Sequence, residues 1–142
     1  MSDPELGRKL LDILARGYDS LTAGRTLLNQ GLYADAVSRA YYAAFHAVVA
    51  LLTAYGKSAS SHAVVKATFH RDFVRTGLLN KDLGRSFERL SDDRQLGDYS
   101  YQANWSMERV VSDLDAADAL LNSIETYLKQ QGSLLADDEE SH

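Results

Sequence analysis

Arg39, Tyr42 and His46 follow one another at intervals of three and four residues. In a helix this spacing brings their side chains to one face. One interpretation is a polar site on the bundle surface or at a subunit interface. In the alternative, neighbouring carboxylates and backbone groups satisfy Arg39 and His46, and Tyr42 is a core residue with a hydrated hydroxyl.

A second group comprises Arg94, Asp98, Tyr99 and Tyr101, at the end of an expected helix and in the loop after it. Arg94 takes the position of the next core residue on the inner stripe of that helix. An isolated buried charge is very costly, so this arginine needs a nearby carboxylate or an opening to solvent. It could therefore offer a fork of donors to a phosphate in a cleft. Alternatively, it ties the loop to the helix end.

The first group lies on an expected helix over residues 36–54, which contains no glycine or proline. A second face of this helix carries small residues at heptad spacing: Ala36, Ala40, Ala43, Ala47, Ala50 and Ala54. Next to it runs a further apolar stripe: Val37, Tyr41, Ala44, Val48, Leu51 and Tyr55. A helix that is apolar on most sides is normally buried. We therefore expect this helix to form the centre of the fold.

The first expected helix starts at Asp3, a good N-cap, and Pro4, which suits the first helical position, and it ends near residue 29. Its inner stripe contains Gly17 and Gly24. Each glycine inside a helix costs roughly 1 kcal/mol relative to alanine. Close approach of the alanine stripe could offset that cost, and we favour this interpretation over one in which both glycines face water.

Three further helices complete the predicted fold. A short one covers residues 62–76 after a serine cap at Ser60 or Ser61, and another starts at Asn80 and ends near Gly97. The last carries an apolar heptad stripe: Met107, Val110, Leu114, Ala117, Leu121, Ile124 and Leu128. Stripes of this period pack as near-antiparallel bundles. The prediction is an all-α, antiparallel up-down bundle of four long helices and one short helix, with residues 1–132 as one domain and 133–142 as a disordered acidic tail.

Composition excludes several classes of site. The chain has 142 residues, 45% hydrophobic and 25% charged, as in an ordinary globular domain. It has no cysteine, which rules out disulfides and thiolate chemistry, and none of its four histidines has the spacing of a helical metal pair. We expect no metal and no cofactor. Its net charge of −5 argues against broad electrostatic affinity for nucleic acid, although a small local site is compatible with it.

No leader peptide or membrane span is expected, because no apolar run approaches the required length of ~20 residues. Ser38, Arg39 and His46 interrupt the central helix. The expected location is the cytoplasm.

Several separated motifs resemble one family. The run AVSRAYYAAFHAVVALL is followed by SSH at the start of a short helix, then by FVRTGLLNKDLGR and DRQLGDYSY, and finally by a heptad helix. Together, in this order, they resemble stand-alone prokaryotic HEPN-domain proteins over about residues 18–127. The resemblance implies a helical bundle that commonly forms homodimers.

The resemblance also implies a function. Many HEPN domains are metal-independent ribonucleases with an Arg-x4-6-His motif, and in toxin–antitoxin pairs they are the toxin beside a minimal nucleotidyltransferase antitoxin. Some extend the motif to Arg-x4-His-x-Tyr, where the antitoxin modifies the tyrosine. Here Arg94 matches the arginine and Tyr101 the last tyrosine, but Tyr99 stands at the histidine position. A tyrosine, with a pKa of ~10, is a poor base at neutral pH. The one literal Arg-x6-His match joins Arg39 to His46 on another helix.

Three functional hypotheses follow. The preferred one is a HEPN-type module that binds RNA, nucleotide or a nucleotidyltransferase partner, with Arg39, Tyr42, Asp98 and Tyr101 as binding residues. The second is an active ribonuclease in which Arg94 clamps the phosphate and Tyr99 or His46 assists. The third is a non-catalytic dimerisation scaffold. For either of the first two, we expect the group around Arg39 and the group around Arg94 to form two walls of one cleft.

Overall fold

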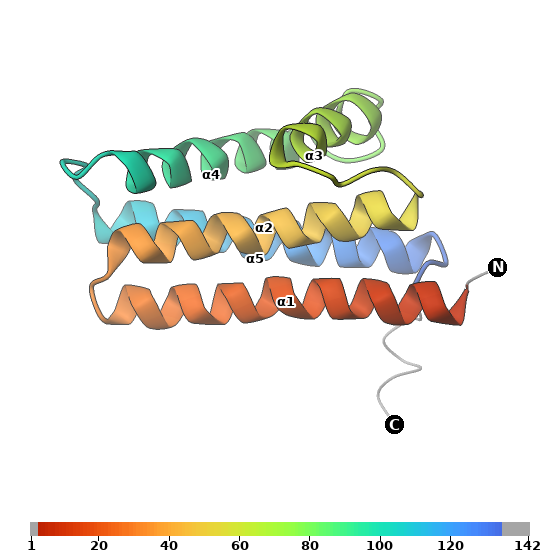
Figure 1. Cartoon of the computed structure of the whole chain (residues 1–142), viewed down its shortest axis with the longest axis horizontal. Coiled ribbons are helices and arrows are strands. Elements are labelled where there is room, and N and C mark those ends of the chain that lie inside the picture. Colours follow the sequence, from red (N-terminus) through yellow and green to blue (C-terminus); the bar gives the residue numbers. More distant parts are fainter. Residues whose placement is uncertain (1–2, 135–142) are drawn as a thin grey trace.

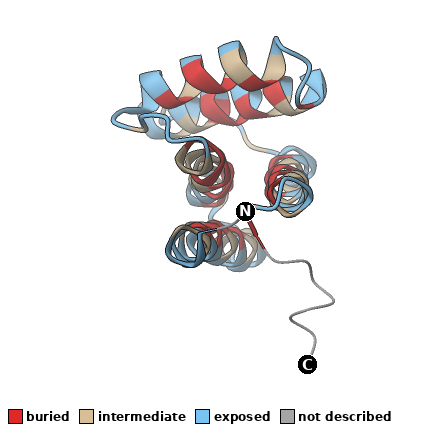
Figure 2. Cartoon of the chain, turned by 90° about the vertical axis from the view of Figure 1, so that its right-hand side faces the viewer, coloured by how far each residue is buried: buried red, intermediate tan, exposed pale blue. Residues whose placement is uncertain are grey.

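The computed structural model describes residues 3–134 of the chain. Within this range all regular elements are helical, as predicted, and the long ones pack antiparallel (Figure 1). The elements are α1 (Pro4–Asn29), α2 (Tyr33–Ala54), α3 (His62–Phe69), the π-helical turn η1 (His70–Val74), α4 (Lys81–Tyr99) and α5 (Met107–Gln130). α3 and η1 run across one end of the bundle instead of along it (Figures 1 and 2).

Local sequence explains where the helices start and stop. Asp3 caps α1 by accepting a hydrogen bond from the Glu5 N–H at 3.0 Å, with Pro4 at the first helical position. Ser61 and Asn80 cap α3 and α4 in the same way. All three caps are as predicted. They fix the entry of α3 and α4, the two elements that carry part of the candidate site.

The core surrounds α2 (Figure 2). Its alanine stripe is fully buried from Ala36 to Ala50. A Cβ added at Gly17 would lie 3.1 Å from the Ala43 carbonyl oxygen, and one at Gly24 would lie 3.4 Å from the Ala36 carbonyl oxygen. The prediction that these glycines let α1 approach the alanine stripe is therefore confirmed. A Cβ at either glycine would also lie 2.7 Å from a leucine methyl of α5, so a larger residue would require movement.

Two predicted helix limits were wrong. A single helix was expected over residues 62–76, but its α-helical part ends at Phe69 and the wider turn η1 follows. The His70 ring, at the start of η1, packs against Gly84 of α4. α4 does not stop near Gly97 but continues to Tyr99. The reason is packing, since a Cβ at Gly97 would lie 3.3 Å from the Trp105 ring. Here glycine serves close approach inside a helix and does not end it.

The α5 stripe is buried from Val110 to Leu128, as predicted, but Met107 is 55% exposed, because the first turn of α5 extends past the core. Beyond the expected domain limit at Gly132, Leu134 still packs in the core. Most of the expected acidic tail, residues 135–142, lies outside the described residues.

By length and composition alone, α2 could cross a membrane, with a mean hydropathy of 1.2 over its most apolar window. The sequence prediction had taken it as too interrupted for that. In the structure 61% of this window is buried against other helices, which accounts for its apolar character as a core helix.

Candidate functional site

Arg94 lies against two adjacent aromatic rings near the surface of the bundle. Its guanidinium carbon lies 5.1 Å from the ring centroid of Tyr41 and 5.4 Å from that of Tyr42. Its Nε is 3.2 Å from a carboxylate oxygen of Asp98, one turn further along α4, but it makes no aligned hydrogen bond. With 21% of the side chain exposed, two cation–π contacts and one ion pair compensate the loss of water. The guanidinium is thus fixed in place and retains donor capacity.

His62, the first residue of α3, joins this cluster. Its Nδ1 is 2.7 Å from the buried Tyr41 hydroxyl, and its ring stacks on Phe45 with centroids 4.3 Å apart. Partial burial, together with the positive charges of Arg94 and Lys66, lowers the pKa of His62 below its usual value. The imidazole is therefore neutral at pH 7. Since Nδ1 is engaged by Tyr41, Nε2 is the nitrogen left for a ligand.

Burial raises the pKa of Tyr41 to about 12, although the Arg94 charge opposes the shift. The tyrosine is therefore a neutral phenol at any physiological pH. It joins α2 to α3 and holds both His62 and Arg94 in position.

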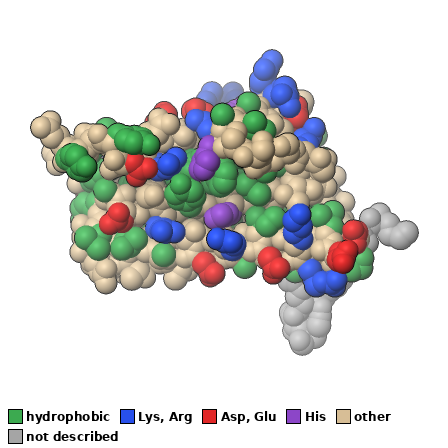
Figure 3. Space-filling model, in the orientation of Figure 1, with side chains coloured by type: hydrophobic (Ala, Val, Ile, Leu, Met, Phe, Trp, Pro, Cys, Tyr) green, Lys and Arg blue, Asp and Glu red, His purple; other side chains and the backbone are tan. Residues whose placement is uncertain are grey.

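Next to this cluster lies a groove of about 610 Å³ between α1 and α2. Its lining residues are Arg16, Asp19, Ser20, Ala23, Arg39, Tyr42 and His46. Burial, and then the charge of Arg16, lowers the pKa of half-buried His46. On the face seen in Figure 3, histidine side chains lie among basic, acidic and hydrophobic ones. Two neutral histidines and several arginines therefore share one side of the molecule.

The structure brings most of the predicted site residues onto one continuous surface. Arg39, Tyr42 and His46 line the groove together, and Tyr42 also touches the Arg94 guanidinium. The two expected walls therefore adjoin through Tyr42. His46, however, is influenced by Arg16, whereas the histidine that feels the Arg94 charge is His62.

Tyr99 and Tyr101 make no hydrogen bond, ion pair or ring contact with Arg94 among the interactions of residues 3–134. Tyr99 is 81% exposed and Tyr101 is fully exposed, in the last turn of α4 and just after it. Asp98 is the only member of that segment that contacts Arg94 among the interactions of the described residues.

Sequence analysis missed His62 and Tyr41 as site residues. Tyr41 was assigned to the apolar stripe of the central helix, and His62 was examined only as a metal ligand. A histidine directly after the capping serine of a helix was the available clue, since SSH belongs to the motifs that carry the resemblance. Their contact depends on how α3 folds back over α2, which local spacing does not reveal.

Comparison with known proteins agrees with this architecture. A model of the HEPN domain matches residues 10–129. The chain belongs to the HEPN domain family. The match covers all five α-helices in whole or in large part, so the recognised motifs and the described bundle refer to the same unit.

Relatives of this HEPN chain come from bacteria and archaea. A "UPF0332 protein" of Thermotoga maritima is 38% identical over 114 residues, covering 80% of this chain and 86% of the relative. "Putative toxin MJ0142" of Methanocaldococcus jannaschii is 30% identical over 85% of this chain and 82% of its own. "Putative toxin MJ0605" of the same organism is 32% identical over 79% and 83%.

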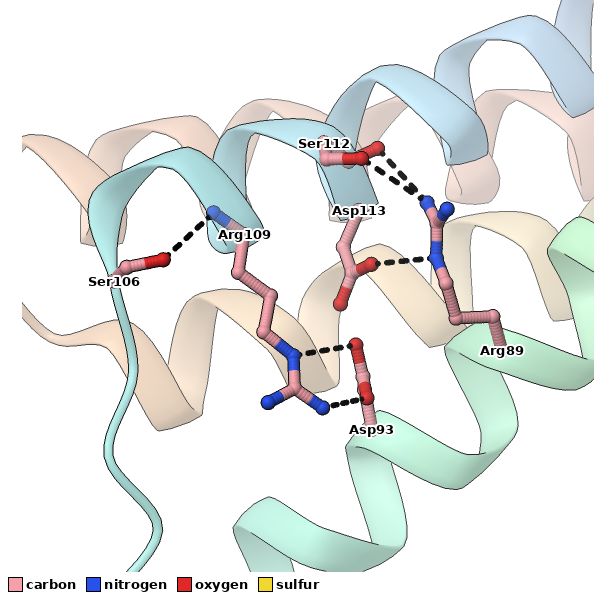
Figure 4. Close-up of polar contacts among 6 residues, drawn as sticks. All are labelled: Arg89, Asp93, Ser106, Arg109, Ser112 and Asp113. Atoms are coloured by element: carbon pink, nitrogen blue, oxygen red, sulfur yellow. Dashed lines mark hydrogen bonds and ion pairs between the residues drawn. The ribbon is translucent and has the colours of Figure 1, made fainter.

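A second polar cluster in the HEPN bundle lies between α4 and α5 (Figure 4). Asp93 and Asp113 are almost completely buried, and each is paired with one arginine. Arg109 reaches Asp93 at 2.5 Å and 3.4 Å, while Arg89 reaches Asp113 at 3.2 Å and the backbone and side chain of Ser112 at 3.3 Å. These two ion pairs join α4 to α5, and one of their members, Asp93, directly precedes Arg94.

Of these two buried carboxyl groups, Asp113 favours the protonated form more strongly than Asp93 does. Burial, and then the neighbouring Asp93, raises the pKa of Asp113 to about 7. Burial opposes ionisation of Asp93 as well, but hydrogen bonds with Asp113 and Arg109 lower the pKa of Asp93 below its usual value. Two neighbouring carboxylates in a buried interface each disfavour the ionisation of the other. Asp93 is therefore the ionised partner.

Among residues 3–134, no three histidine, aspartate or glutamate side chains are grouped as metal ligands would be. The chemistry that these residues can support is phosphate binding by Arg94 and proton transfer by His62.

Proposed function

We propose that this HEPN protein is a toxin-type module that binds single-stranded RNA through Arg94, Tyr42 and His62. The observation that carries the proposal is the Arg94 guanidinium, which lies against both the Tyr41 and the Tyr42 ring, while His62 binds the same Tyr41. A fixed guanidinium suits a phosphate oxygen, and exposed aromatic or imidazole rings suit the face of a base. The relatives named as toxins support the biological class.

Single-stranded RNA is favoured over a duplex because the cationic surface is small. The net charge of −5 argues against a broad basic face that would follow two phosphate backbones. Recognition of unpaired bases by stacking needs only a few rings and charges.

The test is fluorescence anisotropy with a labelled single-stranded RNA at several salt concentrations. Arg94→Ala should weaken binding by about tenfold or more, since a charged hydrogen bond contributes roughly 1.5–3 kcal/mol. Arg85→Ala is the matched control, because Arg85 lies on the same helix, is 71% exposed and pairs only with Asp82. Equal binding by both variants would overturn the proposal.

A second candidate is metal-independent RNA cleavage, favoured by the neutral His62 close to Arg94. In the tautomer whose Nδ1–H donates to the Tyr41 hydroxyl, the Nε2 of His62 would take the proton from a ribose 2′-hydroxyl, whose oxygen then attacks phosphorus. The bond from phosphorus to the 5′-oxygen breaks, the 5′-oxygen takes up a proton from water and a 2′,3′-cyclic phosphate remains, while Arg94 stabilises the charged phosphorane. This HEPN chain should then cleave single-stranded RNA in EDTA. His62→Ala should reduce the rate by ~10²–10⁴, whereas Tyr99→Phe should not. Cleavage that survives both His62→Ala and Arg94→Ala would exclude this mechanism.

The partner expected from the family is also part of the proposal: a homodimer that associates with a minimal nucleotidyltransferase antitoxin. Complete exposure of Tyr101 supports it, because a modifying enzyme can reach the hydroxyl without unfolding the bundle. A native pull-down with mass spectrometry should recover the nucleotidyltransferase and a nucleotide on Tyr101. If purified partner and ATP leave Tyr101 unmodified, this part of the proposal fails.

A further inference from the structure

The groove between α1 and α2 is lined by two arginines that have no carboxylate partner. Among the described residues neither Arg16 nor Arg39 takes part in an ion pair, although both line the groove. Most other arginines do pair with carboxylates: Arg25, Arg71, Arg85, Arg89, Arg94 and Arg109. Asp19 also lines the groove but lies beyond ion-pair distance of both. The groove therefore has uncompensated positive charge available for an anion.

Close packing of the helices directs these side chains into the groove. A Cβ at Gly24 would lie 3.2 Å from the Cβ of Arg39, and one at Gly17 would lie 3.5 Å from the Cβ of His46. The α1 backbone thus lies directly against the bases of both side chains. Arg39 and His46 can extend only along the groove or outward, and this is why polar groups border a packed helix interface.

The groove continues from the Arg94 cluster. Tyr42 lines the groove and contacts the Arg94 guanidinium, so there is no intervening element. Arg39 and His46 lie on either side of Tyr42 on α2, and seven residues of helix span roughly 10 Å. This length exceeds a single phosphate group and suits a short extended strand.

We propose that the α1–α2 groove binds the nucleotides that flank the RNA phosphate held by Arg94. Arg16 and Arg39 contact backbone phosphates, and His46 contacts a phosphate or a ribose hydroxyl. This inference rests on the proposed RNA-binding function and adds a second subsite to it. The ligand class is single-stranded RNA longer than a dinucleotide.

RNA fits this groove better than an acidic peptide does. The Tyr42 ring lies between the groove and the Arg94 cluster and offers an aromatic face to a base.

The test compares two labelled single-stranded RNAs, a dinucleotide and an oligonucleotide of about eight residues. The double variant Arg16→Gln/Arg39→Gln should lose about tenfold or more of its affinity for the longer RNA and bind the dinucleotide unchanged. For this variant, the slope of log K against the logarithm of the salt concentration should decrease in magnitude by about 1.4, because two phosphate contacts that contribute ~0.7 each are lost. The control is Arg8→Gln/Arg75→Gln, which removes the same charge from exposed arginines outside the groove.

A second readout separates direct contact from a general loss of charge. Phosphate beside His46 favours its protonated form, so the His46 pKa measured by NMR should rise when the longer RNA binds and stay constant with the dinucleotide.

Each outcome distinguishes this inference from the function on which it rests. If neither RNA binds, the proposed function fails. A second outcome has three parts: both RNAs bind, Arg94→Ala abolishes binding, and the groove variant has the same affinity for the longer RNA as its control. In that case the proposed function stands and only the groove subsite fails. The subsite also fails if the groove variant loses binding to a polyglutamate peptide but not to RNA, or if light scattering shows a changed oligomeric state.

Discussion

The buried carboxyl pair makes a sharp prediction about pH and stability. Asp113 is fully buried, with Asp93 beside it, and its pKa is raised to about 7. A carboxyl whose pKa is higher in the folded than in the unfolded state holds its proton more tightly when folded. Its contribution to stability is complete below the unfolded pKa of ~3.9 and is lost as the pH rises from there to about 7.

The size of the effect follows from the shift. Moving the pKa from ~3.9 to about 7 corresponds to roughly 4 kcal/mol at 1.36 kcal/mol per unit. Asp113→Asn replaces the carboxyl by a neutral amide that still accepts from Arg89 and donates in place of the carboxyl proton. The free energy of unfolding of the variant minus that of the unchanged protein should therefore rise by roughly 2 kcal/mol between about pH 5 and 7.

The assay is urea unfolding followed by circular dichroism across this pH range. Subtracting the two proteins cancels the opposite contribution of His46 and His62, whose lowered pKa values make stability increase with pH below ~6.5. Asp115→Asn, on the same helix but 63% exposed, is the control for removing an α5 carboxylate that is not buried. A flat difference for Asp113→Asn would refute the raised pKa of Asp113 between α4 and α5.

Three further predictions concern packing and capping. Gly17→Ala should lower the free energy of unfolding by about 1 kcal/mol net, because the new Cβ would lie 2.7 Å from a Leu121 methyl. Gly7→Ala is the control: the nearest atom to its new Cβ is 3.7 Å away, so the free energy of unfolding should rise by up to ~1 kcal/mol. A higher melting temperature for Gly17→Ala would contradict the close approach of α1. Ser61→Ala removes the N-cap of α3 and should cost about 1 kcal/mol, with faster amide hydrogen exchange confined to that helix. Tyr41→Phe keeps the ring but removes the α2–α3 hydrogen bond, so thermal unfolding should show a loss of about 1 kcal/mol, and no loss would mean that the bond contributes nothing.

The sequence alone determined the features that depend on short-range spacing. The heptad stripes of α2 and α5 and the caps at Asp3, Ser61 and Asn80 predicted an all-helical bundle, because periodicity and capping act within a few residues. The motif order was also sufficient to identify the HEPN family.

Only the tertiary structure decided which polar groups meet. His62 reaches Tyr41, 21 residues away in the chain, because α3 turns back over α2. Asp93 and Asp113 meet because α4 and α5 pack closely, and neither residue stands out in the sequence. Gly97 lies inside α4, where its missing side chain makes room for Trp105. Long-range packing sets these contacts, and a one-dimensional pattern carries no information on which helix faces will be opposed.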